Sequence, residues 1–143
     1  MDDCIFCDIV AGEAPASIVY EDETVSSFLT TGPINPGHLL VIPKQHKPLL
    51  SDLDEETGMH IFKVTMQMAK ALRYSGLQCE GINLFLADGE AAFQDVFHVH
   101  MHVFPRFQGD PFKIDASWKN KPSRQELDKI AEHIRRADQF LQQ

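Results

Sequence analysis

The chain has 143 residues, of which 43% are hydrophobic and 24% are charged, a balance typical of a globular domain with a hydrophobic core. The 21 acidic residues outnumber the 13 lysines and arginines, and the resulting net charge of −8 argues against a protein that holds nucleic acid by its phosphates. The sequence has no apolar run long enough to span a membrane and no recognisable targeting segment, so we expect a cytoplasmic protein without a membrane partner.

Two of the three cysteines lie at the start of the chain, in Cys4-Ile5-Phe6-Cys7. An odd number of cysteines without a secretory signal argues against a disulfide framework. The Cys-x-x-Cys spacing suits a zinc site, a redox pair or two buried thiols. Zinc is favoured if other parts of the chain supply further ligands, because two thiolates do not complete a tetrahedral site.

Short apolar segments and one long amphipathic segment follow the cysteine pair. The strands predicted from them cover residues 18–20, 25–29, 38–43 and 81–86. The loop at residues 31–37 contains two prolines and two glycines and would join two adjacent antiparallel strands. The helical periodicity predicts a helix that is capped by Ser51 or Asp52 and stops at Gly76.

The last part of the chain is irregular up to Pro122 and then helical. Ser123-Arg124-Gln125-Glu126 has the pattern of a capping box, and an amphipathic helix follows it to the C-terminus. Strands in hairpins, with helices between and after them, predict an α+β fold with a five-stranded antiparallel sheet, one central helix and a C-terminal helix. No glycine-rich turn of the dinucleotide or P-loop type is present, and we expect no organic cofactor.

The fifth predicted strand, residues 97–104, carries His98, His100 and His102 at every second position. A period of two places the three imidazoles on one face of the strand. Histidine suits proton transfer, nucleophilic attack or metal binding near neutral pH. A purely structural triad is disfavoured because each buried imidazole needs a partner. A single three-histidine metal site is also disfavoured, because alternate residues of a strand lie about 7 Å apart and three span about twice that distance. Nucleophilic attack on phosphorus is the third alternative.

The segment His98-Val99-His100-Met101-His102-Val103-Phe104 resembles the His-φ-His-φ-His-φ-φ motif, where φ is apolar, of the histidine triad (HIT) family of nucleotide hydrolases and transferases. The bacterial and fragile-histidine-triad branches are most similar. Further similar segments are Cys4–Cys7, Pro36–Lys44, Asp88–Ala92, Pro105-Arg106 and Gly109-Asp110. The resemblance implies a HIT-like catalytic domain over residues 1–112. Residues 113–143 would be an irregular tail and a helix that pack on this domain, so that the chain is a single domain overall.

The resemblance implies cleavage at the α-phosphorus of a nucleoside phosphoramidate or a dinucleoside polyphosphate. His100 would attack the phosphorus and carry the nucleotide as a covalent intermediate. His98 and His102 would orient His100 and support the phosphate, and Gln94 would hold phosphate oxygens. The other implied substrate-site residues are His38, which completes the polar network; Phe6, Ile9, Phe28 and Leu29, which enclose the base; and Thr30, near the ribose.

The resemblance also implies a structural zinc ion and a homodimer. Family members that begin with Cys-x-x-Cys resemble the galactose-1-phosphate uridylyltransferases, in which two cysteines and two histidines bind zinc. The matching positions are Cys4, Cys7, His46 and His98. The homodimer would be joined through the two sheets or the central helices, and its only support in the sequence is the surplus of apolar residues on the central helix.

Four residues depart from the family pattern around the substrate. Thr30 stands where many members have an acidic residue that reaches the ribose, and threonine cannot accept the pair of bonds that a carboxylate accepts. Ala87 replaces an amide residue, Phe93 replaces a glycine, and Asp95 replaces a serine or threonine. Asp95 also puts negative charge near the path of a phosphate. These departures keep open an alternative function as a nucleotide-binding or regulatory module with weak turnover.

Overall fold

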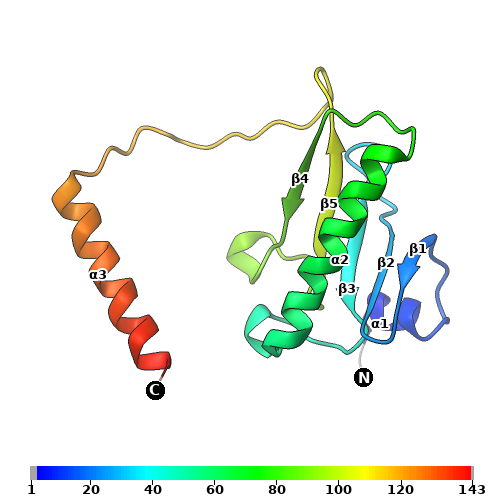
Figure 1. The fold of residues 1–143 in the computed structure, drawn as a ribbon, viewed down its shortest axis with the longest axis horizontal. Helices are drawn as coiled ribbons and strands as arrows, with labels where there is room; N and C mark the ends of the chain where they lie inside the picture. Colours follow the sequence, from blue (N-terminus) through cyan, green and yellow to red (C-terminus); the bar gives the residue numbers. More distant parts are fainter. Residues whose placement is uncertain (1–2, 143) are drawn as a thin grey trace. The chain divides into compact units, whose positions relative to one another are not determined.

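The computed structural model describes residues 3–142, and its chain forms two units that divide between Phe112 and Lys113. The elements of the first unit are α1 (Ile5–Val10), β1 (Ile18–Glu21), β2 (Val25–Leu29), β3 (Leu39–Pro43), α2 (Glu55–Tyr74), β4 (Gly81–Phe85) and β5 (Met101–Arg106), with short 3-10 helices at Leu50–Asp52 and Glu90–Ala92 (Figure 1). The second unit contains α3 (Arg124–Leu141).

Within the described residues, the strands form one five-stranded antiparallel sheet with the order β1-β2-β3-β5-β4. This confirms the predicted fold class. The loop between β2 and β3 joins them as the predicted hairpin, in which Leu29 pairs with Leu39. Figure 1 shows α2 running across one face of the sheet.

Alternation along β3 divides the core between the two faces of the sheet. Leu39 and Val41 face α2, where they pack in a cluster with Val64 and other apolar residues of that helix. Leu40 and Ile42 point to the opposite face and pack with Phe6, Phe28 and Cys4. Each buried side chain of this size stabilises the fold by roughly 1.5–3 kcal/mol. The second face thus binds the N-terminal helix α1 firmly to the sheet.

The helix α2 differs from the prediction at its N-terminus. α2 begins after Asp54, whose carboxylate accepts a hydrogen bond from the Thr57 amide at 3.1 Å, and Leu50–Asp52 forms a separate 3-10 turn instead of the start of the helix. Gly76, with φ of +87°, follows the C-cap as predicted. The sequence did not predict α1, because six residues are too few to show helical periodicity.

The histidine segment is only partly a strand. β5 begins at Met101, four residues later than predicted, so His98 and His100 precede it. The Val99 amide donates to the carbonyl of Lys47 at 2.7 Å rather than to β3. The three histidines therefore do not lie on one face of a regular strand, and the side chain of His98 need not point the same way as those of His100 and His102.

A buried carboxylate closes the loop after β5. Asp110 accepts hydrogen bonds from Arg106 Nε at 2.7 Å, from Asn35 Nδ2 at 2.8 Å and from the Phe107 amide at 3.1 Å. The Arg106 guanidinium and the other donors hold the pKa of the Asp110 carboxyl far below its ordinary value. The network joins the end of β5 to the loop that precedes β3.

Asp110→Asn should lower the urea midpoint of unfolding at pH 7, because the amide cannot accept this set of bonds and Arg106 loses its ionic partner. The depressed native pKa means that this stabilisation is present above the ordinary aspartate pKa of about 4 and is lost as the pH falls below it. The difference between the native chain and the variant should therefore shrink below pH 4. Asp115→Asn, at an exposed aspartate, is the matched control. A midpoint equal to that of the control would contradict the account.

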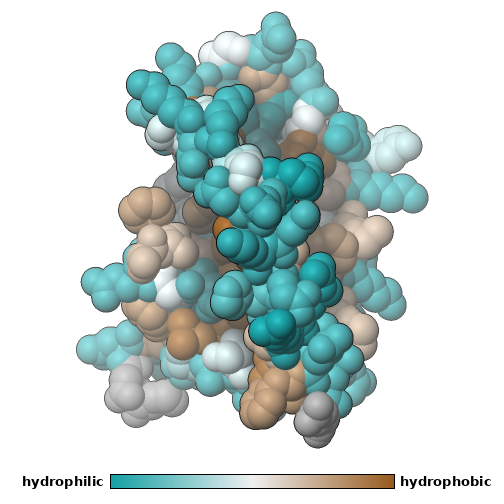
Figure 2. Space-filling view, turned by 90° about the vertical axis from the view of Figure 1, so that its left-hand side faces the viewer, coloured by the Kyte–Doolittle hydropathy of each residue, from teal (hydrophilic) through white to brown (hydrophobic). Residues whose placement is uncertain are grey.

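The second unit begins with an irregular segment. Residues 113–122 form no helix or strand in the described structure, and α3 follows. The Ser123 hydroxyl accepts from the Glu126 amide and the Glu126 carboxylate accepts from the Ser123 amide, each at 3.1 Å, which confirms the capping box. The face in Figure 2 is mostly hydrophilic, with hydrophobic side chains between the polar ones. None of the helices in residues 3–142 is sufficiently long and apolar to cross a membrane.

Candidate active site

A cavity of about 790 Å³ lies on the face of the sheet opposite α2. Its wall contains two of the three triad histidines, His100 and His102, together with Asp95. The other side chains predicted for the substrate site that line it are Phe6, Ile9, Phe28, Leu29 and Thr30. Residues far apart in the sequence thus line one space with both apolar and polar side chains.

His100 has one nitrogen available to a ligand. Its side chain is only 3% exposed, and its Nδ1 lies 2.8 Å from the carbonyl oxygen of His98. A carbonyl oxygen can only accept, so Nδ1 carries the proton and Nε2 of the neutral ring has a free lone pair. The rings of Phe6 and His102 pack against His100 edge to face, with centroids 5.0 Å away. The imidazole is therefore held in the tautomer that a nucleophile at Nε2 needs.

A chain of hydrogen bonds sets the tautomer of His102. The Ile34 amide donates to His38 Nδ1 at 3.0 Å, so the proton of His38 is on Nε2. His38 Nε2 lies 2.9 Å from His102 Nδ1 and donates to it. The proton of neutral His102 is then on its own Nε2, as a donor for a phosphate oxygen. Burial lowers the pKa of His102 to about 4, with the neighbouring His100 and His38 acting in the same direction, and it also lowers the pKa of His38.

Gln94 and His38 lie outside the wall of the cavity. Gln94 Oε1 accepts from the Gly89 amide at 2.8 Å, and Nε2 donates to the carbonyls of Pro48 at 2.7 Å and Val96 at 3.1 Å. All its polar atoms hold the loop that carries Asp95, so the expected direct contact of its side chain with phosphate has no free donor. Its place is that of a positioning residue.

His98 also lies outside the cavity wall, and both of its nitrogens have partners. Nε2 donates to the carbonyl of Pro43 at 2.7 Å, which leaves the lone pair on Nδ1. That atom lies 3.5 Å from Cys4 Sγ and 3.6 Å from Cys7 Sγ. The side chain of His98 therefore belongs to the cysteine pair, whereas its carbonyl oxygen orients His100.

The ligand atoms of Cys4, Cys7, His46 and His98 all lie within 4.8 Å of one another. Cys7 Sγ is 3.3 Å from His46 Nδ1. Sulfur and nitrogen ligands at about 2.3 and 2.1 Å from a tetrahedral zinc ion are about 3.6 Å apart, which agrees with these distances. The Pro43 carbonyl supplies the partner for the second nitrogen that metal-binding histidines generally have. The cluster can hold a metal ion, and the donor set suits zinc.

Two features of the segment before His98 were visible in the sequence only as departures from the family pattern. Asp95 Oδ1 lies 3.4 Å from His100 Nε2, the nitrogen with the free lone pair. Phe93, two residues earlier, has φ of +70° and is the only residue other than glycine with positive φ in the described part of the chain. A side chain in this conformation carries backbone strain of about 1 kcal/mol or more, which explains why glycine suits the position.

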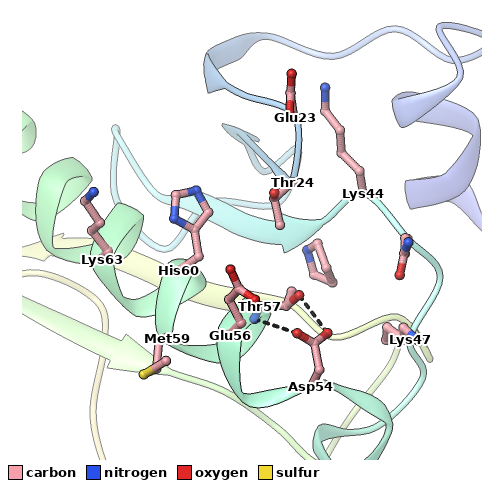
Figure 3. Close-up of a pocket in the computed structure, with 12 residues that line it drawn as sticks. Glu23, Thr24, Lys44, Lys47, Asp54, Glu56, Thr57, Met59, His60 and Lys63 are labelled. Carbon is pink, nitrogen blue, oxygen red and sulfur yellow. Dashed lines mark hydrogen bonds between the residues drawn. The ribbon is translucent and has the colours of Figure 1, made fainter.

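A second cavity, of about 600 Å³, lies at the start of α2 (Figure 3). Figure 3 shows Lys44, Lys47 and Lys63 around it together with acidic side chains. Lys44 is paired with Glu21 at 3.1 Å, and His60 is paired with Asp22 at 2.7 Å. The charges are mixed and partly paired, so the cavity shows no preference for a ligand of either sign.

Comparison with known proteins shows one consistent relationship. The family model described as the HIT domain matches residues 11–109. A HIT-like protein of Borreliella burgdorferi is 44% identical over 113 residues, which are 78% of this chain and 81% of that protein. The adenylylsulfatase HINT3 of Arabidopsis thaliana is 36% identical over 111 residues, which are 76% of this chain and 54% of that protein.

Solved structures show the same similarity in three dimensions. A HIT family protein from Bacillus anthracis is 40% identical, with a TM-score of 0.86 over 95% of this chain and 97% of that one. A zinc-bound histidine triad family protein from Mycobacterium smegmatis is 41% identical, with a TM-score of 0.74 over 94% of this chain and 97% of that one.

Proposed function

Because the chain belongs to the HIT family, we propose that it is a nucleotide hydrolase or transferase that acts at the α-phosphorus of a nucleoside phosphoramidate or a dinucleoside polyphosphate. The observation that carries the proposal is the state of His100. Its Nδ1 proton is held by the His98 carbonyl, and its Nε2 lone pair belongs to a side chain that lines the cavity. An imidazole in this state is a nucleophile that needs no further activation by a base.

The base of the substrate lies between the apolar side chains at one end of the cavity, which brings the α-phosphate to the histidines. His100 Nε2 attacks the phosphorus, the N–P bond forms, and the bond to the leaving group breaks with its electron pair on the leaving atom, which takes a proton from water. His102 Nε2 donates to a non-bridging oxygen, where charge develops. A water molecule then attacks the phosphorus, the N–P bond breaks, and the proton of water passes to solvent. The nucleoside monophosphate leaves, and the lone pair of His100 is restored.

We also propose that the metal ion is zinc and that it is structural. Cys4, Cys7, His46 and His98 would hold it. Bound there, zinc supplies a cross-link between the N-terminal helix, the segment after β3 and the residue whose carbonyl orients His100. The zinc-bound relative supports this choice of ion.

The proposed homodimer rests on the exposed apolar residues of α2. Met59, Phe62 and Met66 are exposed along this helix. Contiguous apolar side chains of this kind mark a surface for protein association. Sedimentation of the native chain and of Phe62→Glu tests the proposal: the variant should sediment as a monomer, and a monomeric native chain would contradict it.

A panel of purine and pyrimidine nucleoside phosphoramidates and dinucleoside polyphosphates tests the proposed reaction. The expected result is release of the nucleoside monophosphate from at least one substrate, measured by chromatography.

Thr30 in place of a carboxylate and the contact of Asp95 with the nucleophile favour a second candidate, a nucleotide-binding module. Tight binding of the nucleotides with no product from any of them would support the module and exclude the hydrolase.

A further inference from the structure

We propose that Asp95 determines the leaving group, and that it favours substrates that release an amine over substrates that release a phosphate or polyphosphate. The inference rests on the proposed function, and it selects one of the two substrate classes named there.

Asp95 Oδ1 lies 3.4 Å from His100 Nε2, and Asp95 lines the same cavity. Attack on phosphorus requires the phosphorus atom to come within about 3–3.5 Å of Nε2. The phosphoryl group thus occupies the space in front of Nε2 that the carboxylate now borders. The Asp95 side chain is 80% exposed, its Oδ1 accepts a hydrogen bond from the Val96 amide at 2.9 Å, and its backbone belongs to the loop that Gln94 fixes. The carboxylate therefore remains next to the reacting phosphoryl group.

The charge of Asp95 is not balanced by a cation in the cavity. No lysine or arginine is among the described residues that line it, and Asp95 is the only acidic residue among them. Residues 1–112 contain 16 of the 21 acidic residues and only six of the 13 lysines and arginines. A polyphosphate leaving group brings several negative charges toward this carboxylate without a partner to offset the repulsion. A neutral or cationic amine meets no such repulsion.

Hydrogen bonding to Asp95 favours a phosphoramidate over a polyphosphate, as the charge of Asp95 does. The bridging nitrogen of a phosphoramidate carries an N–H, which can donate to the Asp95 carboxylate. The bridging oxygen of a polyphosphate has only lone pairs, which face the lone pairs of the carboxylate. A hydroxyl side chain in this place would donate to either bridging atom, whereas the Asp95 carboxylate can only accept.

The test compares two substrates that share the nucleoside and the α-phosphate: adenosine 5′-phosphoramidate with an amine leaving group, and a diadenosine polyphosphate. The measured quantity is the ratio of their kcat/KM values. Asp95→Asn keeps the size of the side chain and the oxygen that accepts from the Val96 amide, but it removes the charge. We expect the ratio to shift toward the polyphosphate by about tenfold or more. Asp95→Ala also removes the acceptor for the N–H and should shift the ratio further.

Salt supplies a second readout. Ionic strength screens exposed charges over about 10 Å at 0.1 M, so the preference of the native protein for the phosphoramidate should weaken between 0.05 and about 0.5 M sodium chloride. The ratio of Asp95→Asn should change much less over the same range. Glu90→Gln is the matched control, because Glu90 is an exposed acidic residue in the preceding turn that does not line the cavity. Its ratio should stay within about twofold of the native value.

A ratio in Asp95→Asn and Asp95→Ala equal to that of Glu90→Gln, with both substrates still turned over, would overturn the role of Asp95 and leave the proposed reaction intact. Absence of product from both substrates with the native protein would overturn the proposed reaction itself, and the inference with it. The two failures are therefore distinct.

Discussion

His100→Ala should lower the rate of nucleoside monophosphate release by roughly four orders of magnitude or more, because it removes the imidazole lone pair that forms the bond to phosphorus in the proposed reaction. The nearby His102 cannot take its place. The His38–Ile34 chain keeps the lone pair of His102 on Nδ1, where His38 occupies it, and leaves Nε2 protonated. Steady-state kinetics with the best substrate of the panel measures the loss.

The controls separate loss of chemistry from loss of fold. His100 is buried, so His100→Asn is used beside His100→Ala, since it leaves a smaller cavity. Both variants should still bind the product nucleotide and melt cooperatively. His133→Ala removes an exposed histidine of α3 and should leave the rate within about twofold of native. Turnover in His100→Ala that equals the native rate would contradict the assignment of the nucleophile.

Removal of the metal should have the second largest effect. A chelator should lower the midpoint of thermal unfolding by about 10 °C or more. Loss of a structural ion removes roughly 3 kcal/mol of stabilisation, and each kcal/mol shifts the midpoint by about 4 °C. Burial, together with the neighbouring Cys4, raises the pKa of the Cys7 thiol to about 11, so without an ion this thiol stays neutral near pH 7. The rate should fall as well, because the carbonyl of His98 orients His100.

Cys7→Ser tests the same site without a chelator, and Cys79→Ser is its matched control, since Cys79 lies outside the cluster. Elemental analysis should find about one zinc ion per chain in the native protein and in Cys79→Ser, and much less in Cys7→Ser. Calorimetry should show the lower midpoint for Cys7→Ser alone. Metal-free native protein with the same midpoint as zinc-loaded native protein would contradict the structural role.

The sheet was predictable from the sequence because its strands alternate locally and the loop at residues 31–37 marks a hairpin. The turn of the chain before Met101 was not, because it depends on a bond from the Val99 amide to Lys47, in a segment some 50 residues earlier. Strand alternation therefore placed His98 on the face of His100, whereas tertiary contacts turn it to the cysteines.

In the candidate site, too, the sequence motifs were predictable, whereas the contacts made by distant parts of the chain were not. The three histidines and the cysteine pair stand out as motifs, and family resemblance pointed to His46 and to the apolar side chains that line the cavity. The tautomers of His100 and His102 depend on the carbonyl of His98 and the amide of Ile34, which carry no side-chain signal in a sequence. Gln94 has an amide suited to phosphate, yet its donors are taken by two backbone carbonyls. Residue type alone does not reveal such occupied partners.

The covalent intermediate on His100 is the central claim, and mass spectrometry of the quenched reaction tests it most directly. The protein is mixed with a nucleoside phosphoramidate and quenched in alkali within the first turnover, so that the N–P bond survives. The account predicts an increase of one nucleotidyl group in the intact mass, located by peptide mapping on His100 and absent in His100→Ala. Product release during the same interval with no adduct, or with the adduct on another residue, would contradict it.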